Sequence, residues 1–68
     1  MILYRFLTGP DDSAFCRKVS AALSKGWLLQ GPPMMTFDPV QGRVICGQAV
    51  MKKVKNMDYQ ADMKLSDF

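Results

Sequence analysis

The 68-residue sequence contains no histidine and no glutamate. The absence of histidine excludes the Ser-His and Cys-His pairs of common hydrolases, an imidazole general base and a histidine metal ligand. Cysteine is scarce, because Cys16 and Cys46 are the only two. They are too few for the disulfide framework of a small secreted protein, and their spacing matches no zinc or thioredoxin-like motif. We therefore expect a protein that is not an enzyme and binds no metal or cofactor.

Long apolar segments are also missing. No run of apolar residues approaches the roughly 20 that span a bilayer. Residues 1–6 do not combine a basic segment with a long apolar stretch, as a signal peptide would. Together with the low cysteine count, these absences predict a cytoplasmic protein that does not bind membranes.

The residues that are present are typical of one small globular domain. Apolar residues make up 49% of the chain and charged residues 22%, which excludes whole-chain disorder. Nine basic residues against six acidic ones give a net charge of +3, which permits an anionic partner without requiring one. A chain of this length builds only a weak core by itself, so a partner subunit commonly supplements it.

Three segments have the composition of β-strands. Residues 2–7 alternate in side-chain direction and are rich in β-branched and aromatic residues. Residues 27–37 form a second extended run, but residues 31–33, Gly-Pro-Pro, interrupt it and predict a strand that lies at an edge or carries a bulge. Residues 43–54 are nearly continuously apolar with small residues in the middle, which predicts a central strand.

A helix is predicted from about residue 13 to residue 25. Asp11 and Asp12 suit its N-terminus, where they can cap it and complement its dipole, and Gly26 suits its C-terminal end. The apolar residues between them recur with the helix period and form one stripe, made of Phe15, Val19, Ala22 and Leu23.

These elements predict an α+β fold with the order β-α-β-β. The three strands should form a mainly antiparallel sheet, in the order first, third, second, with the helix on one face. Residues 1–55 would form the domain. Residues 56–68 would form a C-terminal tail that is either a short helix or disordered.

Several short motifs resemble those of a known family. They are the run over residues 3–16, and then Lys25-Gly26-Trp27, Phe37-Asp38-Pro39 and Cys46-Gly47-Gln48-Ala49-Val50. Over roughly residues 1–54 the chain resembles a bacterial family described only as a domain of unknown function, seventeen-thirty-seven in its series. The resemblance implies a small bacterial protein and no particular activity. Pro32-Pro33 and the tail after Val54 fall outside the family's pattern.

The predicted architecture itself indicates a binding surface. One helix covers only one face of the sheet, and the other face still carries apolar side chains, which usually marks an interface. We therefore expect a non-enzymatic interaction module that forms a homo-oligomer, most simply a dimer. The residues predicted to form the contact are Tyr4, Phe6, Gly47, Gln48 and Val50.

Two alternative functions stay open. A weak nucleic-acid-binding surface would use the basic residues Arg43, Lys52, Lys53 and Lys55, although a solvated strand end is the favoured explanation of them. A thiol redox sensor would use Cys16 or Cys46, although free cysteines are commonly small core residues. No residue pattern indicates a particular small-molecule ligand.

Overall fold

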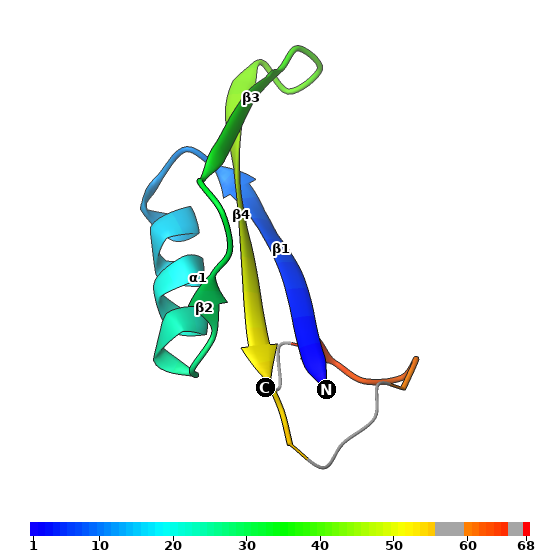
Figure 1. The fold of residues 1–68 in the computed structure, drawn as a ribbon. Helices are drawn as coiled ribbons and strands as arrows, with labels where there is room; N and C mark the ends of the chain where they lie inside the picture. The colour runs from blue at the N-terminus through cyan, green and yellow to red at the C-terminus, as the bar shows by residue number, and fades with distance from the viewer. Residues whose placement is uncertain (56–59, 66–67) are drawn as a thin grey trace.

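The computed structural model describes residues 1–55, 60–65 and 68. A four-stranded antiparallel sheet carries one α-helix against one of its faces (Figure 1). The structure therefore confirms the predicted α+β class. Its longest dimension is 43 Å, because one hairpin projects beyond the helix (Figure 1).

Two long strands form the centre of the sheet. β1 (Ile2–Pro10) pairs with β4 (Arg43–Lys53) in an antiparallel ladder that begins with Ile2 opposite Lys53 and has no break. β4 is the strand that every other strand contacts. Its nearly continuous apolar sequence suits this central position, since it has paired strands along both of its edges.

Two shorter strands share the other side of β4. β2 (Leu28–Leu29) pairs with the C-terminal part of β4, and β3 (Met34–Asp38) pairs with its N-terminal part. The prediction of three strands was wrong in this detail, because the predicted second strand is divided. The observed order is β1-β4-β2, with β3 also paired to β4.

A bulge separates β2 from β3. Residues 30–33 span the same length of β4 as its residues 48 and 49 alone, so this edge contains two extra residues. Gly31 has a φ of 75°, which glycine adopts without strain, and Pro32 and Pro33 have no backbone N–H to donate. The Gly-Pro-Pro sequence is therefore the physical cause of the divided strand.

The helix α1 (Ser13–Ser24) has well-defined ends. The Asp12 carboxylate accepts hydrogen bonds from the backbone N–H groups of Ala14 and Phe15 at 2.9 and 3.3 Å, as an N-cap does. Gly26, with a φ of 93°, ends the helix in the left-handed conformation that favours glycine. These caps fix the helix over β1 and β4.

The core lies between the helix and the sheet. Trp27 follows the helix directly, and its backbone N–H donates to the carbonyl of Ala22 at 3.1 Å. The Arg5 guanidinium lies 5.4 Å from the centre of the Trp27 ring, a cation–π distance. Among the described residues, the buried apolar cluster contains five side chains, which are Leu3, Leu7, Ala22, Trp27 and Val50.

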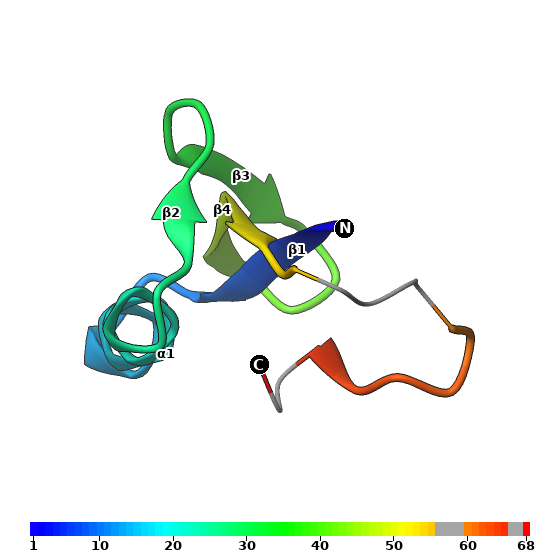
Figure 2. The same ribbon diagram turned by 60° about the horizontal axis from the view of Figure 1, so that its bottom comes forward.

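The C-terminal segment returns to the helix side of the sheet (Figure 2). Leu65 and Phe68 pack against the core cluster, and the Lys52 ammonium donates to the carbonyl oxygen of Phe68. Residues 60–65 and 68 contain no α-helix. The other residues of the predicted tail helix, 56–59 and 66–67, lie outside the described part of the chain.

Candidate interaction surface

The register determines which side chains share a face of the sheet. Residues directly opposite each other in an antiparallel pair point to the same side, and neighbours along a strand alternate. Leu3 and Leu7 of β1 point to the helix, so Tyr4 and Phe6 point to the other side. We call that side the open face, and its exposed apolar side chains are Ile2, Tyr4, Phe6, Leu28 and Met34.

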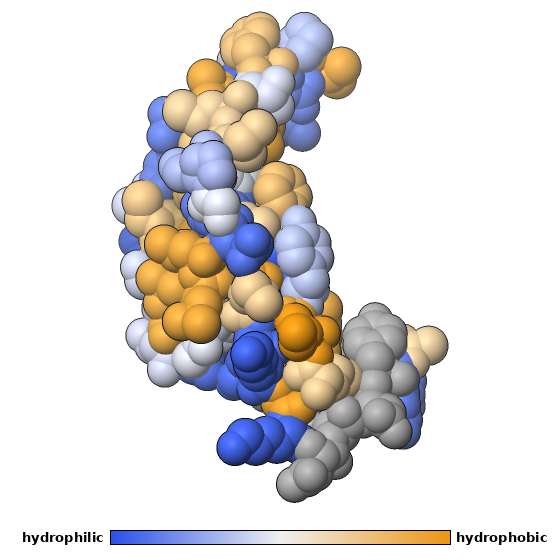
Figure 3. All heavy atoms as spheres, in the orientation of Figure 1, coloured by the Kyte–Doolittle hydropathy of each residue, from blue (hydrophilic) through white to orange (hydrophobic). Residues whose placement is uncertain are grey.

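The open face is apolar and uncovered by any described element. The exposed fractions are 58% for Tyr4, 51% for Phe6, 67% for Leu28 and 58% for Met34. The helix and the described tail residues both lie on the opposite side of the sheet (Figure 2). The space-filling view shows apolar side chains gathered on the surface over the strands (Figure 3). A contiguous apolar surface of this kind typically marks an interface.

At Gly47 the backbone of β4 has no side chain on the open face. The Phe6 ring crosses over it, and a Cβ atom at Gly47 would lie 2.9 Å from Phe6 Cε2 and closer still to Cζ. A glycine in a strand commonly marks such a close approach, and a cross-strand aromatic ring then covers the bare backbone. The neighbour that approaches Gly47 is thus a side chain of the same protein.

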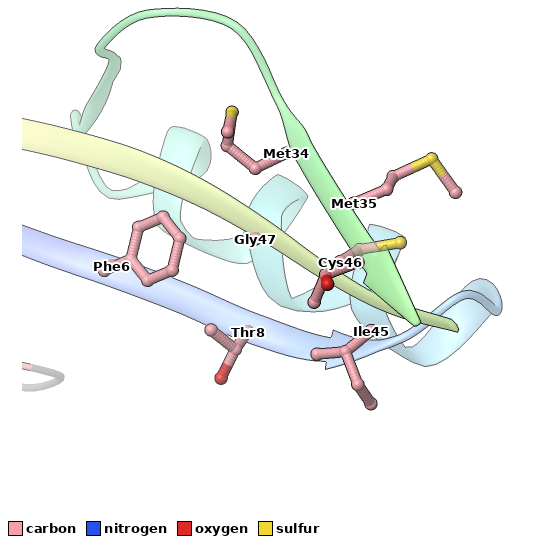
Figure 4. A pocket seen from close by; sticks show the side chains of 8 residues that line it. Phe6, Thr8, Met34, Met35, Ile45, Cys46 and Gly47 are labelled. Atoms are coloured by element: carbon pink, nitrogen blue, oxygen red, sulfur yellow. The ribbon is translucent and has the colours of Figure 1, made fainter. Parts of the chain in front are cut away.

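A shallow hollow of about 340 Å³ adjoins this contact. Figure 4 shows the Phe6 ring and the Met34 side chain beside Gly47, while Met35 extends to the other side of β3. Phe6, Met34 and Ile45 supply apolar walls, with Thr8 at the rim. The hollow gives the open face a concave region that an apolar side chain of a partner can fill.

Two of the predicted contact residues lie on the other face. Gln48 and Val50 are 5% and 0% exposed beneath the helix, so neither belongs to the open face. The Gln48 amide donates to the carbonyl oxygens of Gly31 at 3.2 Å and Ala49 at 2.9 Å. Gln48 therefore ties the bulge to β4, and Val50 is a core residue.

Leu28 and Met34 are surface residues that the sequence-based prediction missed. Their place on the open face depends on pairing with Met51 and Gly47, respectively. Neither Leu28-Leu29 nor Met34-Met35 alternates between apolar and polar residues. The register of two segments separated by a bulge was not visible in the sequence either, so the face of each could not be assigned.

The predicted basic strip is divided between the two ends of β4. Arg43 starts the strand at the hairpin, and its Nε donates to the Gln41 side chain at 2.8 Å. Lys53 ends it about 33 Å away, at roughly 3.3 Å per residue. Lys52 Nζ donates to the Lys25 carbonyl at 2.7 Å, and Lys55 is exposed beyond the strand.

The two thiols occupy different environments, and both are free. Cys16 is exposed on the helix, whereas Cys46 is buried in β4. Burial, with the neighbouring Asp11 carboxylate, raises the pKa of Cys46 above its ordinary value of 9.0. A thiol with a raised pKa is mostly protonated at neutral pH and is a poor nucleophile.

The family assignment agrees with the extent of this architecture. The family model described as Domain of unknown function (DUF1737) matches residues 1–53. The chain belongs to this family. The predicted resemblance is thus confirmed, and the DUF1737 match ends at Lys53, the last residue of β4, so it contains the helix and every strand. The chain has no significant match among curated proteins or solved structures.

Two further properties concern the described residues alone. They contain no group of three or more His, Cys, Asp or Glu side chains placed to hold a metal ion. The helix of this DUF1737 domain is too short to cross a bilayer, and no other described segment forms a membrane-spanning helix.

Proposed function

We propose that this DUF1737 domain is a non-enzymatic interaction module that self-associates through its sheet. The observation that supports the proposal is the open face, where five large apolar side chains are each more than half exposed: Ile2, Tyr4, Phe6, Leu28 and Met34. Apolar patches of this kind are rare on monomeric proteins unless they bind something.

The small core gives self-association an energetic reason. The apolar cluster beneath the helix contains five buried side chains in the part of the chain that the structure describes. Fully burying one large apolar side chain contributes about 1.5–3 kcal/mol of stability. Covering the five side chains of the open face, each about half exposed, should therefore contribute roughly half of that amount per side chain. Small domains commonly obtain missing stability from a second subunit.

The alternatives have weaker structural support. Nucleic-acid binding through Arg43, Lys52, Lys53 and Lys55 would need a continuous basic surface, and these residues are divided between the two ends of a strand. Thiol chemistry would need an accessible, activated thiolate, and the pKa of Cys46 is shifted in the opposite direction.

The test is the molecular mass in solution, measured by light scattering after size exclusion over a concentration series from micromolar to millimolar. We expect a dimer that dissociates on dilution. Phe6→Ser, on the open face, should shift dissociation to higher concentration by at least about tenfold, because it removes a large apolar contact.

Val40→Ser is the matched control. Val40 is also apolar and is 92% exposed, but it lies in the turn between β3 and β4. This variant should dissociate like the unmodified protein. A monomer at every concentration, or equal effects of the two variants, would contradict the proposal.

A further inference from the structure

The outer edge of β1 carries backbone groups that β4 does not use. Met1 and Val54 exchange both backbone bonds, at 2.9 and 2.8 Å, which makes them a hydrogen-bonded pair of the ladder. In an antiparallel ladder such pairs occur at every second residue. The odd-numbered residues of β1 therefore bond to β4, and the even-numbered residues direct their N–H and C=O groups outward.

Two outward positions are already occupied. The carbonyl oxygen of Pro10 accepts from the backbone N–H of Asp12 at 2.8 Å. The carbonyl oxygen of Thr8 accepts a hydrogen bond from Lys18 Nζ of the helix at 2.7 Å. This bond agrees with the outward direction of the even-numbered residues. Ile2, Tyr4 and Phe6 remain, and no described residue forms a backbone bond to their outer side.

Between Ile2 and Phe6 this edge carries no lysine, proline or bulge. Natural edge strands are protected from pairing by lysines, prolines, bulges or very short length. β1 is nine residues long, its only proline is the last residue, and its only charged side chain, Arg5, lies over Trp27. The opposite edge is protected, because the Gly31–Pro33 bulge interrupts it.

We propose that β1 pairs antiparallel with β1 of a second copy, about a two-fold axis at Tyr4, so that the two sheets become one. This proposal rests on the proposed self-association and specifies its geometry. A two-fold contact must be self-complementary, and an antiparallel pair of identical strands meets that condition. The side chains of Tyr4 and Phe6 would then meet those of the partner at the centre of a doubled open face.

The position of the axis follows from elimination. An axis at Arg5 would place two guanidinium groups directly opposite each other, which is unfavourable. An axis at Phe6 would pair Tyr4 with Thr8 of the second copy, whose carbonyl already accepts from Lys18. An axis at Leu3 would pair only Ile2 with Tyr4 and leave Phe6 unused, whereas an axis at Tyr4 pairs Tyr4 with Tyr4 and Ile2 with Phe6 and so uses all three free positions.

Amide hydrogen exchange tests the strand pairing. It is followed by NMR on the full chain, at concentrations above and below the dissociation midpoint. The amides of Leu3, Arg5 and Leu7 bond to β4 and should be protected in both states. The amides of Tyr4 and Phe6 should be protected only in the associated state, by at least about tenfold.

Cysteine cross-linking tests the axis. In a Cys16→Ser background, Tyr4→Cys should form an intermolecular disulfide under copper-phenanthroline oxidation, because a hydrogen-bonded pair has its Cα atoms about 5.5 Å apart. Phe6→Cys is the matched control. Its symmetry mate would lie about 13 Å away along the strand, at roughly 3.3 Å per residue, beyond disulfide reach.

The outcomes separate this inference from the proposed function. A dimer in which the Tyr4 and Phe6 amides exchange freely would overturn edge pairing. Self-association would remain, and the two copies would then associate by stacking their open faces. A dimer with protected amides that cross-links through Phe6→Cys instead would overturn the axis at Tyr4. A protein that stays monomeric would overturn both proposals.

Discussion

The side-chain amide of Gln48 donates to the carbonyl oxygen of Gly31 at 3.2 Å and so links β4 to a bulge residue that lies seventeen positions earlier in the sequence. A buried polar group of this kind is costly unless it is hydrogen-bonded. Here the same Nε2 atom also donates to the carbonyl of Ala49 at 2.9 Å. Gln48 thus stabilises the only irregular stretch along the β2–β3 edge.

Replacing this amide should destabilise the fold. We expect Gln48→Leu to lower the free energy of unfolding by about 1–3 kcal/mol, because it leaves a bulge carbonyl unsatisfied. Urea unfolding followed by Trp27 fluorescence measures the loss, since Trp27 is 1% exposed in the folded state. Gln30→Leu, at an exposed residue beside the bulge, is the control and should change stability by less than about 0.5 kcal/mol.

A methyl group at Gly47 should act through Phe6. In Gly47→Ala the new Cβ would collide with the Phe6 ring, which must rotate away from the strand. A double-mutant cycle with Phe6→Ala measures the coupling, which we expect to be about 0.5–3 kcal/mol. Equal effects of Gly47→Ala in both backgrounds would show that the ring does not lie over this glycine.

The N-cap of α1 should contribute to stability through its side-chain oxygen. Asp12→Ala removes the acceptor of the Ala14 and Phe15 amides, and we expect it to cost about 1 kcal/mol in thermal or urea unfolding. Asp12→Asn keeps an acceptor oxygen and should cost much less. A similar loss in both variants would assign the effect to charge rather than to the cap.

The two cysteines should differ in their rate of alkylation. Iodoacetamide should modify exposed Cys16 first in the native protein, and intact-mass spectrometry with peptide mapping identifies the site. Cys46 should react only after denaturant is added, because burial and Asp11 raise its pKa and lower its thiolate fraction. Rapid native modification of Cys46 would revive the redox alternative.

The raised pKa of Cys46 also predicts a pH dependence of stability. The thiol ionises more readily in the unfolded chain, where its pKa is about 9.0, than in the folded one. The contribution of this thiol to the free energy of unfolding is therefore fully present below pH 9 and is lost as the pH rises through the pKa of the folded state. Urea midpoints across this range should fall more steeply for the unmodified protein than for Cys46→Ala.

Much of the fold followed from the sequence because its local signals agree. The period of the apolar residues predicted the helix, and Asp11-Asp12 predicted its cap region. The small apolar run around Gly47 predicted the central strand. The structure confirms all three predictions. The pattern also predicted an edge strand interrupted at Gly31. What it could not show was that the interruption inserts two residues and divides the strand.

The contact residues were harder to predict, for a geometric reason. Alternation along a strand shows that neighbouring side chains point to opposite faces, but it does not show which face the helix covers. Val50 and Gln48 were therefore predicted as contacts, although they lie beneath the helix. Their small, apolar neighbours suit either face, and only the register against Leu7 and Arg5 decides between them.

The Gly-Pro-Pro interruption has a consequence for how large an assembly can grow. A strand edge propagates pairing only if it offers a continuous row of donors and acceptors, and the β2–β3 edge does not, since Pro32 and Pro33 donate nothing. The sheet thus has one continuous edge at which a further strand can pair. The proposed pairing through β1 would therefore give a closed pair, because the β2–β3 edge offers no continuous row of groups to a further strand.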